Sequence, residues 1–326
     1  MEIRKVQVSG GSSFIISLPK DWATKNGIKK NDKVGVVEGR DGNLIIIPKL
    51  KKMGERSIEF EAEGGEDYIF RLLLASYIDG YNIIRLKARE GIKPSIRKAV
   101  KKFIKCSIGF EIIDENRQLI ILKDFLNPSE LPFEKIIRRI ASIVESMHED
   151  LIYAIRNEDK RTLEDIISRD DDVDRIHWLI SRQYNILSKN IFAEEFFINY
   201  PLLSRILERC ADHAVKIAEN IKNLNKISML ADEIISAEFF AFKIFRESIS
   251  SFFNKDLRGA NRCIEMVKKI NEKCAKINNE ALRKDTKSVI YIAQISDSIR
   301  RFAEYSGDIA EYTIDYIVRI KEKERA

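Results

Sequence analysis

The feature that most constrains the fold of this 326-residue chain is an acidic pattern that occurs twice, 96 residues apart. Glu208 and Asp212 are four residues apart, and so are Glu304 and Asp308. On a helix, residues i and i+4 face the same side, so each pair directs two carboxylates in one direction. A repeat at a fixed period indicates that one structural unit is present twice.

From about residue 126 onward, apolar residues recur with helical spacing and Gly and Pro are scarce. This pattern predicts six helices, over residues 126–157, 160–189, 201–223, 227–253, 257–282 and 286–321. Together with the repeat, it predicts two tandem three-helix bundles, at residues 126–225 and 226–322. The expected fold class is therefore multidomain and mainly α.

Residues 1–50 show short strands and turns instead. We expect a short helix after Pro19 and strands at residues 2–8, 13–18, 33–37 and 44–47. Asp41-Gly42 is a strong hairpin turn signal between the last two strands. Because strands this short cannot bury a core in about 50 residues, we expect an intertwined homodimer.

Residues 56–125 predict a small α/β domain without a catalytic motif. We expect helices at 66–78 and 93–105, and strands at 57–63, 82–86, 110–113 and 119–122. Four lysines lie near one face of the second helix, and we interpret them as a solvated face.

The net charge of the chain is concentrated near its N-terminus. Residues 1–56 contain twelve Lys or Arg and six Asp or Glu, an excess equal to the net charge of +6 of the whole chain. We therefore expect an anionic partner to meet this segment. We find neither a signal peptide nor an apolar run of about 18 residues, so a cytoplasmic protein without direct membrane insertion is predicted. The four scattered cysteines predict reduced, mostly buried thiols.

Five segments of the N-terminal region follow one another in a recognisable order. They are RKV at 4–6, GGSS at 10–13, SLPKDW at 17–22, GIKKND at 27–32 and LIIIP at 44–48. In this order they resemble the swapped-hairpin DNA-binding domains of the AbrB/SpoVT type, which implies an obligate dimer whose basic face meets DNA. Phosphate contacts need Lys and Arg, and we predict Arg4, Lys5 and Lys20 for that role. The alternative is a dimerisation module whose lysines are solvated.

Residues 207–219, LERCADHAVKIAE, resemble the signature helix of the PhoU family, regulators of phosphate uptake built from two three-helix bundles. The resemblance extends over the helical region, and its fusion to a β-rich module resembles an archaeal-type branch of the family. It implies a regulator rather than an enzyme, whose partner is the ATPase of the phosphate ABC transporter or a sensor kinase. It also implies metal binding at E/D-x-x-x-D motifs on neighbouring helices of each bundle.

In the first bundle the partner motif is Asp170 and Asp174, which would face Glu208 and Asp212. Four carboxylates at close range repel one another unless cations neutralise them or they share protons. Oxygen ligands suit Mg, Mn, Ca or iron, as a divalent or trivalent ion, rather than zinc. The alternative is an acidic helix surface in solvent.

The second bundle departs from this pattern. Glu304 and Asp308 are present, but the segment that matches the partner motif offers Asn271 in place of Asp174 and no carboxylate in place of Asp170. We therefore expect the second site to bind metal weakly.

Two other functions are alternatives for this sequence. Glu145 and His148 have the Glu-x-x-His spacing of di-iron bundles, but a carboxylate-bridged metalloenzyme needs two such units and further glutamates. We interpret the histidines as surface or cap residues, with His177 as a candidate extra ligand and His213 pointing about 100° away from Asp212. The second alternative is a transcription factor whose bundles are only a dimerisation or effector scaffold. No nucleophile, phosphate-loop or dinucleotide motif is present.

Overall fold

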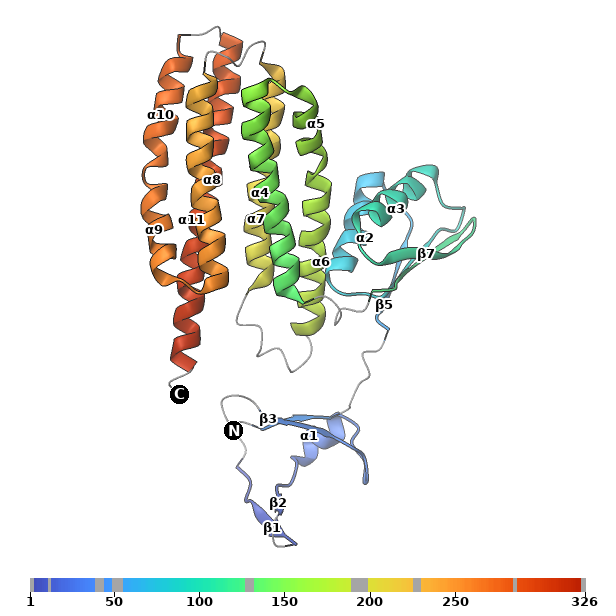
Figure 1. Ribbon diagram of the computed structural model, residues 1–326. Helices are drawn as coiled ribbons and strands as arrows, with labels where there is room; N and C mark the ends of the chain where they lie inside the picture. Colours follow the sequence, from blue (N-terminus) through green and yellow to red (C-terminus); the bar gives the residue numbers. More distant parts are fainter. Residues whose placement is uncertain are drawn as a thin grey trace. The chain divides into compact units, whose positions relative to one another are not determined.

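The computed structural model describes residues 3–10, 13–38, 44–48, 55–126, 132–188, 199–224, 230–283 and 286–323. Contacts divide the chain into two compact units, Met1–Glu55 and Arg56–Ala326. Helices dominate the second unit, while the first is made mainly of short strands (Figure 1). The predicted fold class is confirmed.

The described residues of the N-terminal unit form two antiparallel strand pairs and one short helix. Strand β1 (Gln7–Ser9) pairs with β2 (Ser13–Ile15), and β3 (Gly35–Glu38) pairs with β4 (Leu44–Ile47), with α1 (Lys20–Lys25) between the pairs in sequence. The first two strands are shorter than predicted, and the predicted Asp41-Gly42 turn lies outside the described residues. None of the described side chains of residues 3–48 is buried. The described side chains of one copy of this unit therefore form no hydrophobic core.

The α/β region forms one four-stranded sheet. Its elements are β5 (Ser57–Glu61), α2 (Glu66–Ile78), β6 (Ile83–Lys87), α3 (Pro94–Cys106), β7 (Phe110–Glu115) and β8 (Leu119–Asp124). The strand order is β5-β6-β8-β7, with β5 parallel to β6 and the other pairs antiparallel. Apolar residues of both helices and the sheet share one core. Each predicted strand and helix of this region is present, with ends that differ by no more than a few residues.

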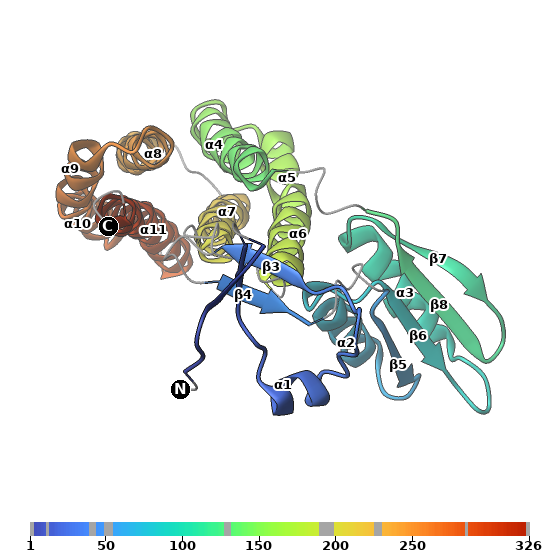
Figure 2. The same cartoon turned by 90° about the horizontal axis from the view of Figure 1, so that it is seen from below.

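Two groups of helices follow, and Figure 2 shows them nearly end-on. The first contains α4 (Phe133–Asn157), α5 (Lys160–Ser168), α6 (Asp170–Ser188) and α7 (Tyr200–Asn223). The second contains α8 (Ala231–Asn254), α9 (Leu257–Val267), α10 (Ile270–Ala281) and α11 (Thr286–Lys323). In each group the middle helix is broken in two, so each group is a three-helix bundle, and one apolar core runs through both.

Some of the predicted helix limits are wrong. Helix α4 begins after Pro132 and not at residue 126, because Pro132 has an extended backbone that precedes the first turn. The predicted helix 160–189 breaks at Arg169, whose guanidinium pairs with Asp165 and, at 2.6 Å, with Asp150 on α4. The predicted helix 257–282 breaks at residues 268–269.

The sheet domain is fixed to the first bundle through α6. Arg182 is 1% exposed, and its guanidinium donates to the Tyr77 carbonyl at 2.6 Å and to Asp124 at 2.5 Å. Asn185 donates to the Ile78 carbonyl at 2.9 Å. The C-terminal half of α6 is thus bonded to both α2 and β8.

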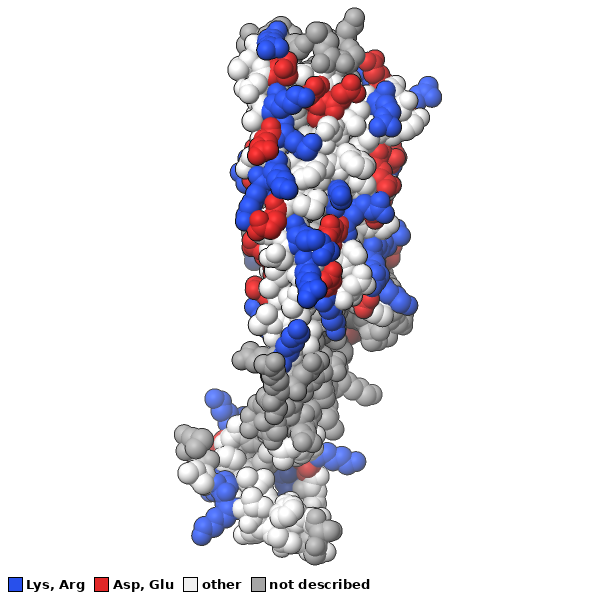
Figure 3. Space-filling view, turned by 60° about the vertical axis from the view of Figure 1, so that its left-hand side comes forward, with Lys and Arg blue, Asp and Glu red and all other residues white. Residues whose placement is uncertain are grey.

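Charges of both signs mix on the face of the bundles shown in Figure 3. Opposite charges on the second bundle form ion pairs such as Arg262–Glu247, Lys268–Glu265 and Lys276–Glu233. The pattern agrees with the balanced charge of the chain beyond residue 56. Among the described helices, none has the length and apolar character needed to cross a membrane.

Candidate metal-binding site

The acidic residues predicted in the first bundle lie on two helices that pack against each other, α6 and α7. Asp170 and Asp174 are in the first turns of α6, while Glu208 and Asp212 are in the middle of α7. Glu208 is 8% exposed, and its Oε1 accepts a hydrogen bond from Arg205 at 3.1 Å.

The charges of these carboxylates affect one another. Burial, followed by the charge of Asp212, raises the pKa of Glu208 to about 7 and that of Asp170 to about 6. Burial, followed by the charges of Asp170 and Asp212, raises the pKa of Asp174 to about 6. The fold therefore brings the four predicted residues near enough to share an electrostatic field, as the helix spacing predicted.

The donor set suits a hard cation, because it consists of carboxylate oxygens. Asp170 Oδ1 and Glu208 Oε2 are buried without a hydrogen-bond partner, which leaves acceptor capacity for a ligand. Within the described part of the chain, however, no three His, Cys, Asp or Glu side chains are gathered in the arrangement of metal ligands. Metal binding would require these side chains to turn toward a common centre, and it stays a prediction.

The raised pKa of Asp174 has a measurable consequence in metal-free protein. Between pH 4 and about 6 the folded state keeps a proton that the unfolded chain releases, so stability falls as pH rises through this range. Asp174→Asn should therefore be more stable than wild type at pH 7.5, by about 1–2 kcal/mol for a partly exposed group. The gain should vanish near pH 4, as measured by urea unfolding at several pH values.

His177 and His213 titrate in the opposite sense, because burial lowers the pKa of each to about 4. The unfolded chain protonates these histidines more readily than the folded state does, so stability falls as pH falls from about 6.5 to 4. Both are present in wild type and in Asp174→Asn, so their contribution cancels in the comparison. Equal stability of the two proteins at every pH would contradict the raised pKa of Asp174.

The carboxylates of the second bundle have different neighbours. Glu304 accepts hydrogen bonds from Arg300 at 2.5 Å and Arg301 at 3.5 Å. Burial and the charges of Glu311 and Glu304 raise the pKa of Asp308. A Cβ added at Gly307, between the two carboxylates, would lie 3.1 Å from a methyl carbon of Val267. At Gly307 the neighbouring helix therefore presents a valine, whereas the helix that faces Glu208 and Asp212 carries acids.

The structure corrects the interpretation of the histidines as surface or cap residues. His148 is fully buried, and His177 and His213 are each 8% exposed. His177 Nδ1 lies 2.9 Å from Ser204 Oγ, so this nitrogen is already engaged. Glu145 pairs with Arg246 at 2.6 Å, while the Nδ1 of His148 meets Glu238. The Glu-x-x-His spacing of Glu145 and His148 does not form a shared site.

The cysteine prediction is confirmed. All four thiols are free, and three are buried. Burial raises the pKa of Cys210 well above its usual range.

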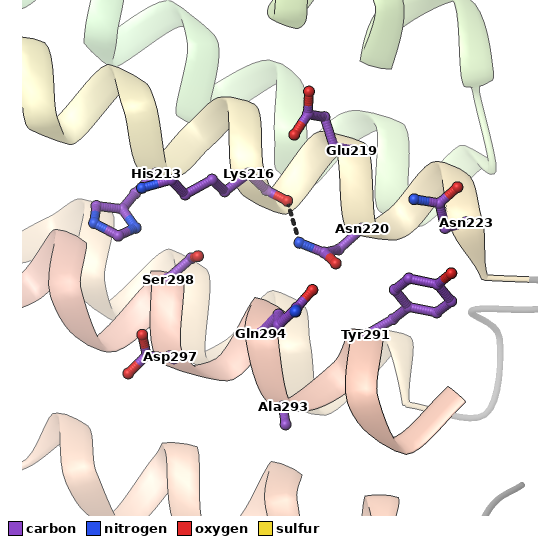
Figure 4. Close-up of a pocket in the computed structure, with 10 residues that line it drawn as sticks. All are labelled: His213, Lys216, Glu219, Asn220, Asn223, Tyr291, Ala293, Gln294, Asp297 and Ser298. Atoms are coloured by element: carbon purple, nitrogen blue, oxygen red, sulfur yellow. Dashed lines mark hydrogen bonds between the residues drawn. The ribbon is translucent and has the colours of Figure 1, made fainter. Parts of the chain in front are cut away.

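A polar groove of about 620 Å³ follows the seam between α7 and α11 (Figure 4). The buried side chains of His213 and Ser298 line it, and His213 Nδ1 has no hydrogen-bond partner. Exposed Gln294 and Asp297 of α11 lie across from the α7 residues. None of the four carboxylates of the acidic site lines this groove, so it is a separate feature of α7.

The predicted DNA-contacting residues all lie in the N-terminal unit. The side chains of Arg4, Lys5 and Lys20 are exposed, and Lys20 is the first residue of α1. Exposure is necessary for phosphate contact, and the role itself stays a prediction.

Fold and site together define a class of protein, a tandem pair of three-helix bundles with acidic motifs on their last helices. The PhoU domain profile matches residues 137–221 and 236–313, one stretch in each bundle and half of the chain in total. This chain belongs to the PhoU family.

One characterised relative and two solved structures are similar to the helical part of this chain. A phosphate-specific transport system accessory protein PhoU homolog from Clostridium acetobutylicum is 24% identical over 200 residues, covering 56% of this chain and 90% of the relative. The crystal structure of PhoU from Pseudomonas aeruginosa has a TM-score of 0.51 at 20% identity, covering 57% of this chain and 95% of that one. For the phosphate transport system regulatory protein PhoU from Streptococcus pneumoniae, the TM-score is 0.49 at 15% identity, with coverages of 58% and 94%. The Pseudomonas structure shows that the bundle fold is shared.

The N-terminal region has a separate match. Residues 7–53 match the profile of the family described as antidote-toxin recognition MazE, bacterial antitoxin. The resemblance of this region to AbrB-type domains is thereby confirmed, as is that of the helical region to PhoU.

Proposed function

We propose that this chain is a dimeric regulator of phosphate uptake whose acidic helix pair binds metal and whose N-terminal unit binds DNA. The observation that carries the proposal is the PhoU match, which spans both bundles and includes the four carboxylates of the first. The Clostridium relative is described as an accessory protein of a phosphate-specific transport system. The bundles would accordingly contact either the ATPase of the phosphate ABC transporter or a sensor kinase.

The acidic pairs of α6 and α7 would hold a divalent or trivalent cation through their carboxylate oxygens. Mg, Mn, Ca and iron fit that donor chemistry. Bound metal would supply positive charge where Asp170, Asp174 and Glu208 repel one another. With the charge neutralised, the four residues would join α6 to α7 and make their separation costly.

The N-terminal unit supports dimerisation because its apolar side chains are exposed in a single copy. Phe14 is 78% exposed, Val8 65% and Leu44 65%. Burying such residues against a second copy supplies the hydrophobic stabilisation that one copy lacks. A paired unit would also bring two sets of basic side chains together for one DNA duplex.

Metal analysis of the purified protein tests the central proposal. Wild type should retain about one equivalent or more of metal after dialysis, while Asp212→Asn should lose most of it, because ligand removal takes away both a donor and its charge. Asp315→Asn, which changes an exposed carboxylate of α11, is the matched control and should bind like wild type. Equally negligible metal in all three proteins would mean that the acidic pairs do not bind metal.

The MazE match favours a second candidate function. In that case the chain is a transcription factor whose bundles serve only as a dimerisation or effector scaffold. DNA binding that is unaffected by phosphate-transport components, together with absence of metal, would support it over the first proposal.

A further inference from the structure

A buried polar node joins four helices of the two bundles. His148 of α4 is fully buried, and its Nδ1 meets Oε1 of Glu238 on α8, a residue that is also fully buried. On the other side of the ring, Nε2 lies 3.2 Å from the backbone carbonyl of Cys210 on α7. The imidazole stacks on Phe302 of α11, with ring centroids 3.5 Å apart and planes 6° apart.

The chemistry of the partners fixes where the protons of His148 lie. The carbonyl of Cys210 can only accept, so Nε2 must carry a hydrogen. The remaining proton lies between Nδ1 and the Glu238 carboxyl, whichever of the two atoms holds it. Glu238 Oε2 is buried without a partner, so this carboxyl depends on His148 for its hydrogen bonding. Loss of either residue leaves the other unsatisfied in the core.

The node holds α7 on the side opposite its acidic face. At 100° per residue, Cys210 lies about 180° around the helix from the midpoint between Glu208 and Asp212. A hydrogen bond to the Cys210 carbonyl from behind therefore opposes rotation or sliding of α7. Apolar contacts have no preferred direction, whereas a buried hydrogen bond at a fixed position specifies the register of α7 against its neighbours.

We infer that His148 and Glu238 are positioning residues for the acidic face of α7. Through them, α8 and α11 of the second bundle contribute to a site whose carboxylates belong to the first. The inference rests on the proposed metal role for its effect on affinity, but the hydrogen-bonding part stands on the geometry of the node. Partners that orient ligand-bearing elements typically change metal affinity by about 10–100-fold when they are removed.

The test compares Mn²⁺ affinity, measured by calorimetry, among full-length variants. Glu238→Leu should weaken Mn²⁺ binding by about 10-fold or more. Glu238→Gln should bind Mn²⁺ with the affinity of wild type, because its amide can donate to Nδ1 while Nε2–H still donates to the Cys210 carbonyl. Ile277→Ala is the matched control, since it opens a cavity in the second bundle at a residue that makes none of the hydrogen bonds or ring contacts described for the node. Equal affinities in Glu238→Leu and wild type, or an equal loss in Ile277→Ala, would overturn the inference.

A second measurement separates failure of the inference from failure of the proposed function. Nitrogen-15 NMR of metal-free wild type should find Nε2 of His148 protonated, and His148→Gln should shift the amide signals of residues 208–212. If wild type binds no Mn²⁺ but both NMR results hold, the positioning role stands and the metal role is lost. An unprotonated Nε2, or unchanged signals for residues 208–212, would overturn the positioning role. If Glu238→Leu does not fold, His148→Gln replaces it in the affinity measurement, because it removes the imidazole that spans Glu238 and Cys210.

Discussion

Replacing Phe14 with aspartate should separate the proposed dimer into monomers. Phe14 lies on β2 and is 78% exposed in a unit whose described side chains include no buried residue. If a second copy covers this ring, a buried charge at its position would cost several kcal/mol, enough to separate chains at micromolar concentration. Light scattering coupled to size exclusion should then report the mass of one chain instead of two.

The matched control is Val318→Asp, which introduces the same charge at a 55% exposed apolar residue of α11. This variant should remain dimeric. A wild-type protein that is already monomeric would contradict the proposed pairing. DNA binding gives a second measurement, since the Phe14→Asp monomer should bind DNA more weakly than wild type. Lys20→Gln should remain dimeric, and the salt dependence of its DNA binding should fall by about one phosphate contact.

Arg182→Met should destabilise the second unit by about 3–5 kcal/mol, because it leaves the charge of Asp124 buried and unpaired. Both side chains of this pair are only 1% exposed. The guanidinium also lies 4.9 Å from the centroid of the Tyr77 ring, so the substitution removes a cation–π contact too. Urea unfolding in a Trp22→Phe background would follow Trp178, whose ring packs edge-on against Phe70 at the same junction.

The double variant Arg182→Met/Asp124→Asn separates the buried charge from the lost contacts. Asparagine carries no charge and can still accept the hydrogen bond that Asp124 Oδ1 receives from the Leu126 amide at 2.9 Å. About half of the lost stability should therefore return. A double variant less stable than Arg182→Met would show that the unpaired charge is not the main cost.

Much of the architecture could be predicted from local patterns. The 96-residue repeat indicated paired bundles, and the interval 66–78 was predicted to the residue as α2, where Gly65 precedes the helix and Asp79 follows it. The breaks at Arg169 and at residues 268–269 were not foreseen, because apolar spacing continues across both positions. At Arg169 the break coincides with ion pairs that include Asp150, which is distant in sequence and therefore invisible to periodicity.

The acidic site was more predictable than the buried polar groups. Asp170, Asp174, Glu208 and Asp212 follow a local spacing that a helix turns into one face, and packing of α6 on α7 brings the two pairs together. His148 and Glu238 are 90 residues apart in the sequence. A separation of that length follows no local spacing rule, so the sequence could not predict their contact. Glu238 did offer a signal, because it interrupts the apolar face between Ile234 and Phe242. Arg182 gave the same signal between Leu179 and Ile186.

The break at Arg169 also changes the electrostatic setting of the acidic motif. It makes Asp170, Asp171 and Asp172 the first turn of a new helix rather than the middle of a long one. Unsatisfied amide groups give the start of a helix a partial positive charge, which stabilises nearby anions by about 0.3–1 kcal/mol each. In the second bundle α10 begins at Ile270, and the acid in its first turn is Glu272 alone. The backbone of α6 thus offsets part of the repulsion among its own carboxylates, a contribution that an unbroken helix would not make.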